Sequence, residues 1–122
     1  MDQPDAYELF RQGSELLESG DHHAATVPLG RARDLAPDKD SVREAYGRAL
    51  FLAQRFSEAA EEFEAVVAHA PTNDYALFCL GRSLQLQGRH AEARKPLALA
   101  SCLRPEREDY SKYLGQARRS AA

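Results

Sequence analysis

The sequence has 122 residues, 43% hydrophobic and 29% charged, a balance that excludes an intrinsically disordered chain and fits one folded domain, residues 1–122. The formal net charge of −3 argues against general electrostatic binding to nucleic acid or to an anionic membrane. The acidic N-terminus lacks the features of a secretory signal and no apolar run approaches the length of a membrane span, so we expect a cytoplasmic protein with both cysteines reduced.

Apolar residues recur at helical spacing along the chain, as in Ala59, Phe63, Val66 and Val67, and the alternation that marks strands is absent. The pattern predicts seven helices, at residues 5–18, 22–35, 40–53, 56–69, 73–86, 90–103 and 107–118. An all-α protein is therefore expected.

Residues that end and begin helices stand between these segments. Gly20 and Gly88 are expected to adopt the left-handed backbone that ends a helix. Asp38 and either Thr72 or Asn73 are expected to cap the helices that follow them.

The chain repeats itself with a period of 34 residues. This interval separates four glycines, three prolines, three alanines and three large apolar residues: Gly13, Gly47, Gly81 and Gly115; Pro37, Pro71 and Pro105; Ala25, Ala59 and Ala93; Leu29, Phe63 and Leu97. Glycine or alanine recurs where paired helices must approach closely, with Leu or Phe flanking these points. Pro28 and Pro96 are two periods apart within predicted helices, which favours a tolerated local kink at both.

This pattern resembles the tetratricopeptide repeat (TPR), whose signature combines a large apolar residue, Leu-Gly, Ala and Pro at set intervals. The third repeat matches best, whereas the second has Arg43 in place of the first apolar residue and Gln54 in place of the turn glycine. The resemblance implies a right-handed α-solenoid of three helical hairpins, at about 6–39, 40–73 and 74–107. A seventh helix, at about 107–118, carries Arg118 where Leu or Tyr is expected, which is typical of a polar capping helix.

In proteins of this family the first helix of each hairpin lines a concave groove, so the resemblance and the repeat register predict a partner-binding surface. The predicted groove residues are Tyr7, Phe10, Ser14, Glu44, Arg48, Phe51, Tyr75, Phe78, Arg82, Gln85, Lys112 and Tyr113, with Leu17, Ser41, Ala45, Cys79, Asp109 and Gln116 also facing inward. Aromatic residues beside arginine are enriched at binding hot spots. We expect Arg48 and Arg82 to hold a carboxylate or backbone carbonyls of a peptide while Phe51, Tyr75 and Phe78 receive apolar side chains. In the alternative interpretation, Tyr7, Phe10 and Phe51 only fill gaps between repeats.

One specific function of the family is argued against by the sequence. Co-chaperone TPRs clamp the acidic C-terminus of major chaperones with lysines, asparagines and an arginine on their first helices. At the corresponding positions this sequence has Phe10, Ser14, Ala45, Tyr75 and Cys79. We therefore expect no chaperone-tail receptor.

The sequence also offers little to catalysis or metal binding. His22 and His23 would point apart on a helix, and His22 and His90 share a repeat position with Phe56, which favours packing in the turns. No phosphate loop, no nucleophile elbow and no carboxylate pair with an evident cleft appears, so we expect no enzyme, no metal and no cofactor.

The expected function is binding of a peptide or helix of a partner protein in the groove. One alternative is a self-associating scaffold, a homo-oligomer, because residues 1–73 carry 14 acidic and 7 basic residues whereas residues 74–122 carry 5 and 9. A small TPR chaperone for a secreted substrate is the other alternative.

Overall fold

The computed structural model describes residues 3–121, and the helices predicted from the sequence are present. They are α1 (Ala6–Glu18), α2 (His22–Leu35), α3 (Asp40–Leu52), α4 (Phe56–His69), α5 (Asp74–Gln85), α6 (His90–Leu103) and α7 (Glu108–Ala121). The described residues contain no strand, so the predicted all-α class is confirmed. The first six helices match the predicted bounds within one residue, whereas α7 continues to Ala121, beyond the predicted end at 118.

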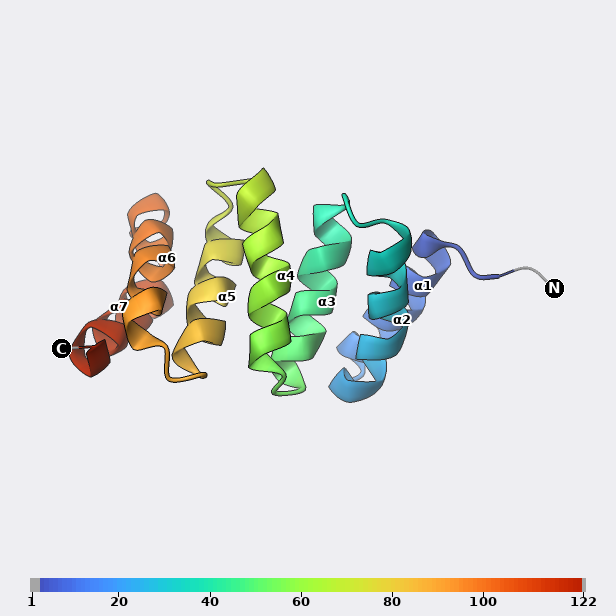
Figure 1. The fold of residues 1–122 in the computed structure, drawn as a ribbon, viewed down its shortest axis with the longest axis horizontal. Coiled ribbons are helices and arrows are strands. Elements are labelled where there is room, and N and C mark those ends of the chain that lie inside the picture. Colours follow the sequence, from blue (N-terminus) through green and yellow to red (C-terminus); the bar gives the residue numbers. More distant parts are fainter. Residues whose placement is uncertain (1–2, 122) are drawn as a thin grey trace.

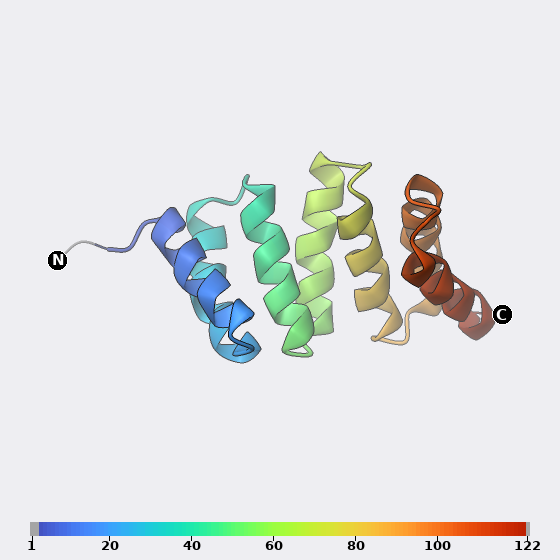
Figure 2. The ribbon, with the colours of Figure 1, turned by 180° about the vertical axis from the view of Figure 1, so that it is seen from behind.

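The helices stand side by side in chain order, so that the molecule is an elongated solenoid with the two termini at opposite ends (Figure 1). Each helix packs chiefly against its neighbours in sequence. One layer contains α2, α4 and α6, and the reverse view shows the other layer, with α1, α3, α5 and α7 (Figure 2). The first helices of the successive pairs therefore share one face of the solenoid. In the described residues, no helix is both long enough and apolar enough to cross a membrane.

The recurring glycines mark the closest contacts between paired helices. A Cβ atom added to Gly13 would lie 2.4 Å from Cγ of Leu29, and one added to Gly81 would lie 2.5 Å from Cγ of Leu97. In the middle pair, a Cβ on Gly47 would approach the Phe63 ring to 2.9 Å. These three large side chains are fully buried, which explains why glycine and a large apolar residue recur together.

The turn within each pair requires a left-handed residue. Gly20 and Gly88 have φ values of 87° and 78°, as predicted. Gln54 takes the same conformation in the middle pair, with φ of 65°, although it has a side chain. After α1 the Asp21 amide donates to the Leu16 carbonyl at 2.9 Å, a bond that closes the helix end.

The predicted caps are partly confirmed. The side chain of Asn73 accepts a hydrogen bond from the Ala76 amide at 3.1 Å and so caps α5. The prediction for Asp38 is wrong, because the cap position before α3 is occupied by Lys39, whose side chain makes no capping bond. Pro28 and Pro96 are buried inside α2 and α6, and both helices continue through them.

The last helix packs on the third hairpin through aromatic contacts. The buried Tyr110 ring stacks on Phe78 with ring centroids 4.6 Å apart, and its hydroxyl donates to the Asp74 carboxylate at 2.8 Å. On α7 itself, Arg118 is exposed, and a Cβ on Gly115 would meet only the Arg119 guanidinium, at 3.3 Å. Gly115 therefore occupies the repeat position of the hairpin glycines, but no large apolar side chain packs against it.

Candidate functional site

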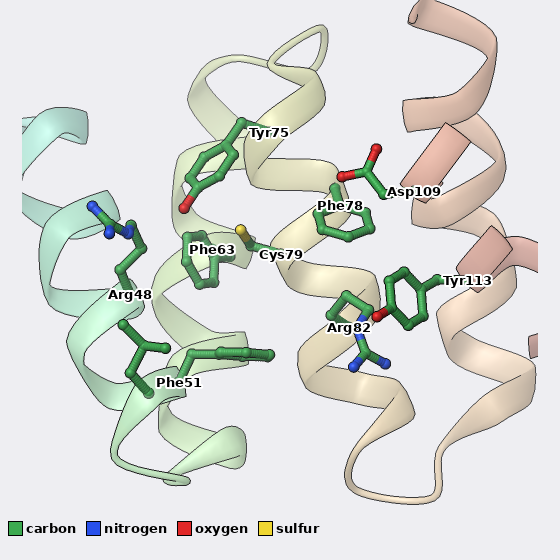
Figure 3. Close-up of a pocket in the computed structure, with 10 residues that line it drawn as sticks. Arg48, Phe51, Phe63, Tyr75, Phe78, Cys79, Arg82, Asp109 and Tyr113 are labelled. Carbon is green, nitrogen blue, oxygen red and sulfur yellow. The ribbon is translucent and has the colours of Figure 1, made fainter. Parts of the chain in front are cut away.

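A hollow of about 430 Å³ opens between α3, α5 and α7, which belong to the layer of first helices (Figure 3). Its lining combines aromatic rings with two arginines and is made by Arg48, Phe51, Leu52, Phe63, Tyr75, Phe78, Cys79, Arg82, Asp109 and Tyr113. We call it the central hollow. Its volume lies within the range of natural ligand pockets.

Several aromatic rings of the central hollow are held by contacts with other rings. Phe78 is tilted against Tyr113, with centroids 5.8 Å apart, in addition to its stack on Tyr110. Phe51 meets Phe56 edge to face at 5.3 Å. The apolar surface of the hollow is therefore built on rigid packing.

The two arginines of the hollow differ in how they are held. The guanidinium of Arg82 lies 3.8 Å from the centroid of the Tyr113 ring and donates to the Gln85 side chain at 2.8 Å. Gln85, which is buried, in turn donates to the Tyr113 carbonyl at 2.9 Å. Burial lowers the pKa of Arg82, and the neighbouring Tyr113 opposes the shift. Arg48, by contrast, is exposed at the edge of the hollow.

Neither Arg48 nor Arg82 forms an ion pair within residues 3–121. Seven other arginines of this part do so: Arg11, Arg33, Arg43, Arg55, Arg89, Arg104 and Arg107. The single carboxylate of the hollow, Asp109, is occupied by Arg107 at 2.8 Å, and that hydrogen bond lowers its pKa. The central hollow therefore carries positive charge that the described residues do not neutralise.

Two other polar groups of the hollow, Tyr75 and Cys79, are neutral at neutral pH. Burial raises the pKa of the Tyr75 hydroxyl, and it raises the pKa of the Cys79 thiol to about 12. A thiol with such a pKa is a poor nucleophile. In addition, no three His, Cys, Asp or Glu side chains of residues 3–121 come together in a way that could hold a metal ion.

Half of the predicted groove residues line the central hollow, namely Arg48, Phe51, Tyr75, Phe78, Arg82 and Tyr113. Tyr7 and Phe10 line a separate hollow near α1 and α3. Glu44 accepts a hydrogen bond from the Asn73 side chain at 2.8 Å, whereas Gln85 lies buried between α5 and α7. Ser14 and Lys112 line neither hollow, although Lys112 lies 5.3 Å from the centroid of the Tyr113 ring.

Two residues of the central hollow were not predicted from the sequence. Phe63 belongs to the second helix of its hairpin, and its fully buried ring lies under the hollow against Gly47, which has no side chain to separate them. Leu52 is the last residue of α3 and is 41% exposed. The pairing of Gly47 with Phe63 by repeat register was the signal that could have found the first of them.

One of the N-terminal aromatic residues, Phe10, both packs between hairpins and lines a hollow. Phe10 packs against the buried residues Leu9, Ala32 and Val42 and so joins two neighbouring hairpins. Tyr7 is 74% exposed and does not fill such a gap.

Comparisons with known proteins agree with this architecture. Two sequence profiles described as tetratricopeptide repeat match residues 16–76 and 47–110, the second covering more than half of the chain. The chain belongs to the TPR family. This family is generally a non-enzymatic protein-interaction fold, so its membership supports an interaction module. No curated protein matches the sequence significantly.

Solved TPR structures share the fold. MamA from Desulfovibrio magneticus RS-1, residues 41 to the end, has a TM-score of 0.87 and 26% identity over 93% of this chain and 64% of that chain. MamA AMB-1 has a TM-score of 0.84 and 25% identity over 93% of this chain and 62% of that one. The chain thus spans just under two thirds of these relatives.

The first TPR of Spaghetti (RPAP3), solved with the HSP90 peptide SRMEEVD, has a TM-score of 0.87 over 99% of this chain and 96% of that one. At 18% identity this likeness concerns the fold alone.

Proposed function

We propose that this TPR protein binds a segment of a partner protein on the face formed by its first helices, with the central hollow as the main site. The observation that carries the proposal is the combination of an aromatic hollow with two arginines that form no ion pair within residues 3–121. The few residues that dominate binding energy at protein interfaces are enriched in Trp, Tyr and Arg. An apolar side chain of the partner would enter the hollow.

The arginines would fix the polar part of the bound segment. A guanidinium forms short, charge-assisted hydrogen bonds with carboxylates, and these bonds are strong where aromatic surroundings exclude water. Arg82 is already oriented by Tyr113 and Gln85, so little side-chain entropy would be lost when it binds. Arg48 is free to adjust to the ligand.

A chaperone-tail receptor is not the function that we propose. Cys79 is a neutral, partly buried thiol and Phe10 packs between hairpins, so neither can replace the cationic and amide groups of the clamp. The segment recognised by the central hollow should therefore owe its affinity to an apolar side chain as well as to charge.

Affinity capture with a charge-reversed variant tests the proposal. Arg48→Glu should abolish retention of a specific partner from the native cell extract, as identified by mass spectrometry. Arg94→Glu is the matched control, because Arg94 is also exposed and lies on α6, outside both hollows. Equal partner retention by the wild type and both variants would contradict the proposal, provided that circular dichroism shows unchanged helix content.

Self-association is a second candidate, favoured by an exposed apolar patch on α6. Leu99 and Leu103 are 42% and 41% exposed, and the exposed Cys102 lies between them on the same side of the helix. Light scattering over a concentration series should then show a dimer or larger species that Leu99→Lys disrupts. A monomer at every concentration, or an oligomer unaffected by this substitution, would exclude the patch as the interface.

A further inference from the structure

A second hollow, of about 240 Å³, is lined by α1, α3 and the turn that precedes α3. Its lining is largely apolar and includes Tyr7, Phe10, Ala36, Lys39, Ser41 and Val42. We call it the N-terminal hollow. Tyr7 is 74% exposed, more than any other large hydrophobic residue in the described part of the chain. A tyrosine so exposed contributes little to the fold and is available to a ligand.

The two hollows use the same pair of residues at the same repeat position. Tyr7 and Phe10 on α1 correspond, two periods of 34 residues later, to Tyr75 and Phe78 on α5, which line the central hollow. Because the repeats stack in register, both aromatic pairs lie on the face that the first helices share. The helix between them, α3, has no aromatic residue at these two positions.

A cationic side chain borders each hollow. Lys39 borders the N-terminal hollow and forms no ion pair within residues 3–121, like Arg48 and Arg82 at the central one. Of the acidic groups nearby, Asp40 contacts His69 at 3.0 Å and Glu44 accepts from the neutral Asn73 amide, whereas the exposed Asp38 forms no ion pair within residues 3–121. The excess of positive charge is therefore at the central hollow, where Arg48 and Arg82 complement an acidic part of the ligand.

We propose that the two hollows are two anchor sites for one extended, acidic segment of a partner protein that carries two apolar side chains. This inference rests on the proposed function and adds the N-terminal hollow to it. Packed helices lie 8–10 Å apart, so the two hollows should be separated by roughly 15 to 20 Å. An extended chain covers this distance in about five residues.

Synthetic peptides labelled with fluorescein test the spacing, with fluorescence anisotropy of the full chain as the measurement. The series carries two phenylalanines separated by one to nine residues of Glu and Ser, and a reference peptide carries one phenylalanine in the same acidic background. Affinity should be greatest when the phenylalanines are about five residues apart, and at least roughly tenfold greater than for the reference peptide.

A substitution in the N-terminal hollow tests its role separately. Tyr7→Ser should reduce the affinity of the best two-anchor peptide to that of the reference peptide and leave the reference affinity unchanged. Val27→Ser is the matched control, because Val27 is 64% exposed but lies on α2, outside both hollows.

The outcomes distinguish this inference from the proposed function. If the reference peptide binds and Arg48→Glu weakens it, but a second phenylalanine adds nothing at any spacing, the two-anchor inference is wrong and the proposed function stands. If Tyr7→Ser leaves the best peptide unaffected, the N-terminal hollow is not an anchor site. Absence of binding by every peptide would overturn both proposals.

Discussion

The carboxylate of Glu62 on α4 lies 2.9 Å from the guanidinium of Arg43 on α3, although Glu62 is only 4% exposed. A second guanidinium, from Arg33 on α2, lies 2.7 Å from the same carboxylate. Arg43 occupies the position where the first and third repeats have the buried residues Leu9 and Leu77. Arg43, at which the second repeat departs from the TPR pattern, therefore belongs to an ion-pair network that joins the first two hairpins.

Removing the carboxylate should destabilise the protein. Glu62→Leu leaves Arg43 and Arg33 without their buried partner, and we expect a loss of about 2–3 kcal/mol in the free energy of unfolding, measured with urea. The double variant Arg43→Leu with Glu62→Leu should recover most of this loss, because two packed leucines replace the pair. Glu106→Gln, which removes an exposed ion pair with Arg104, should leave the urea midpoint unchanged. A double variant less stable than Glu62→Leu would refute this account.

The glycines of the repeat should differ in their tolerance of a side chain. Gly81→Ala places a methyl group 2.5 Å from Cγ of Leu97, and we expect it to cost about 1–3 kcal/mol of stability despite the better helix propensity of alanine. Gly115→Ala occupies the same repeat position but meets only the flexible Arg119 side chain, so it should stabilise the protein by about 0.5–1 kcal/mol. Thermal unfolding of both variants checks the contrast. Equal destabilisation would show that Gly115 also faces a packed surface.

Glycine at the turn between α3 and α4 should stabilise the protein. Gln54 has φ of 65°, a conformation that strains residues with a Cβ atom, so Gln54→Gly should raise the free energy of unfolding by about 0.5–1 kcal/mol. The reverse substitution, Gly88→Gln, should cost a similar amount, since Gly88 has φ of 78° and no atom within 4 Å of an added Cβ. Opposite shifts of the melting temperature are the expected result. A loss of stability in Gln54→Gly would mean that the glutamine side chain makes a compensating contact.

The fold could be predicted because its determinants are local and repeated. The glycine that admits Leu29, Phe63 or Leu97 and the left-handed turn residue recur in register, so each repeat supports the interpretation of the others. Asp38 was wrongly predicted to cap α3, because it lies one residue before the cap position, Lys39. Sequence alone does not define the first residue of a helix to within one position.

The candidate site could be predicted only in part. Repeat register identified Arg48 and Tyr75, because it fixes which face of a helix a residue occupies. Repeat register could not show that the Gln85 side chain donates a hydrogen bond to the Tyr113 carbonyl. Nor could it show that Phe63, from the second helix of its hairpin, lines the hollow. Both depend on side-chain directions and on neighbours distant in sequence.

The two cysteines should differ in reactivity and in their effect on stability at high pH. Cys102 is exposed, whereas Cys79 is partly buried with its pKa raised to about 12. At pH 8 a disulfide reagent such as dithiobis(nitrobenzoate) should therefore modify Cys102 rapidly and Cys79 only after unfolding in urea. Cys102→Ser, which retains only Cys79, should then react slowly in the folded state and rapidly in the unfolded state.

The raised pKa also makes stability depend on pH in a defined direction. The folded state keeps the Cys79 thiol neutral, so its stabilising contribution is complete below the ordinary pKa of 9.0 and is lost as the pH rises toward 12. Between pH 8 and pH 10 the wild type should lose about 1 kcal/mol more unfolding free energy than Cys79→Ala, which has no thiol to ionise. Tyr75 remains in both proteins, and burial, which is the largest cause of its raised pKa, acts on it in both. Equal losses in the two proteins, measured by urea unfolding at both pH values, would show that the Cys79 thiol ionises as readily in the folded chain as in the unfolded one.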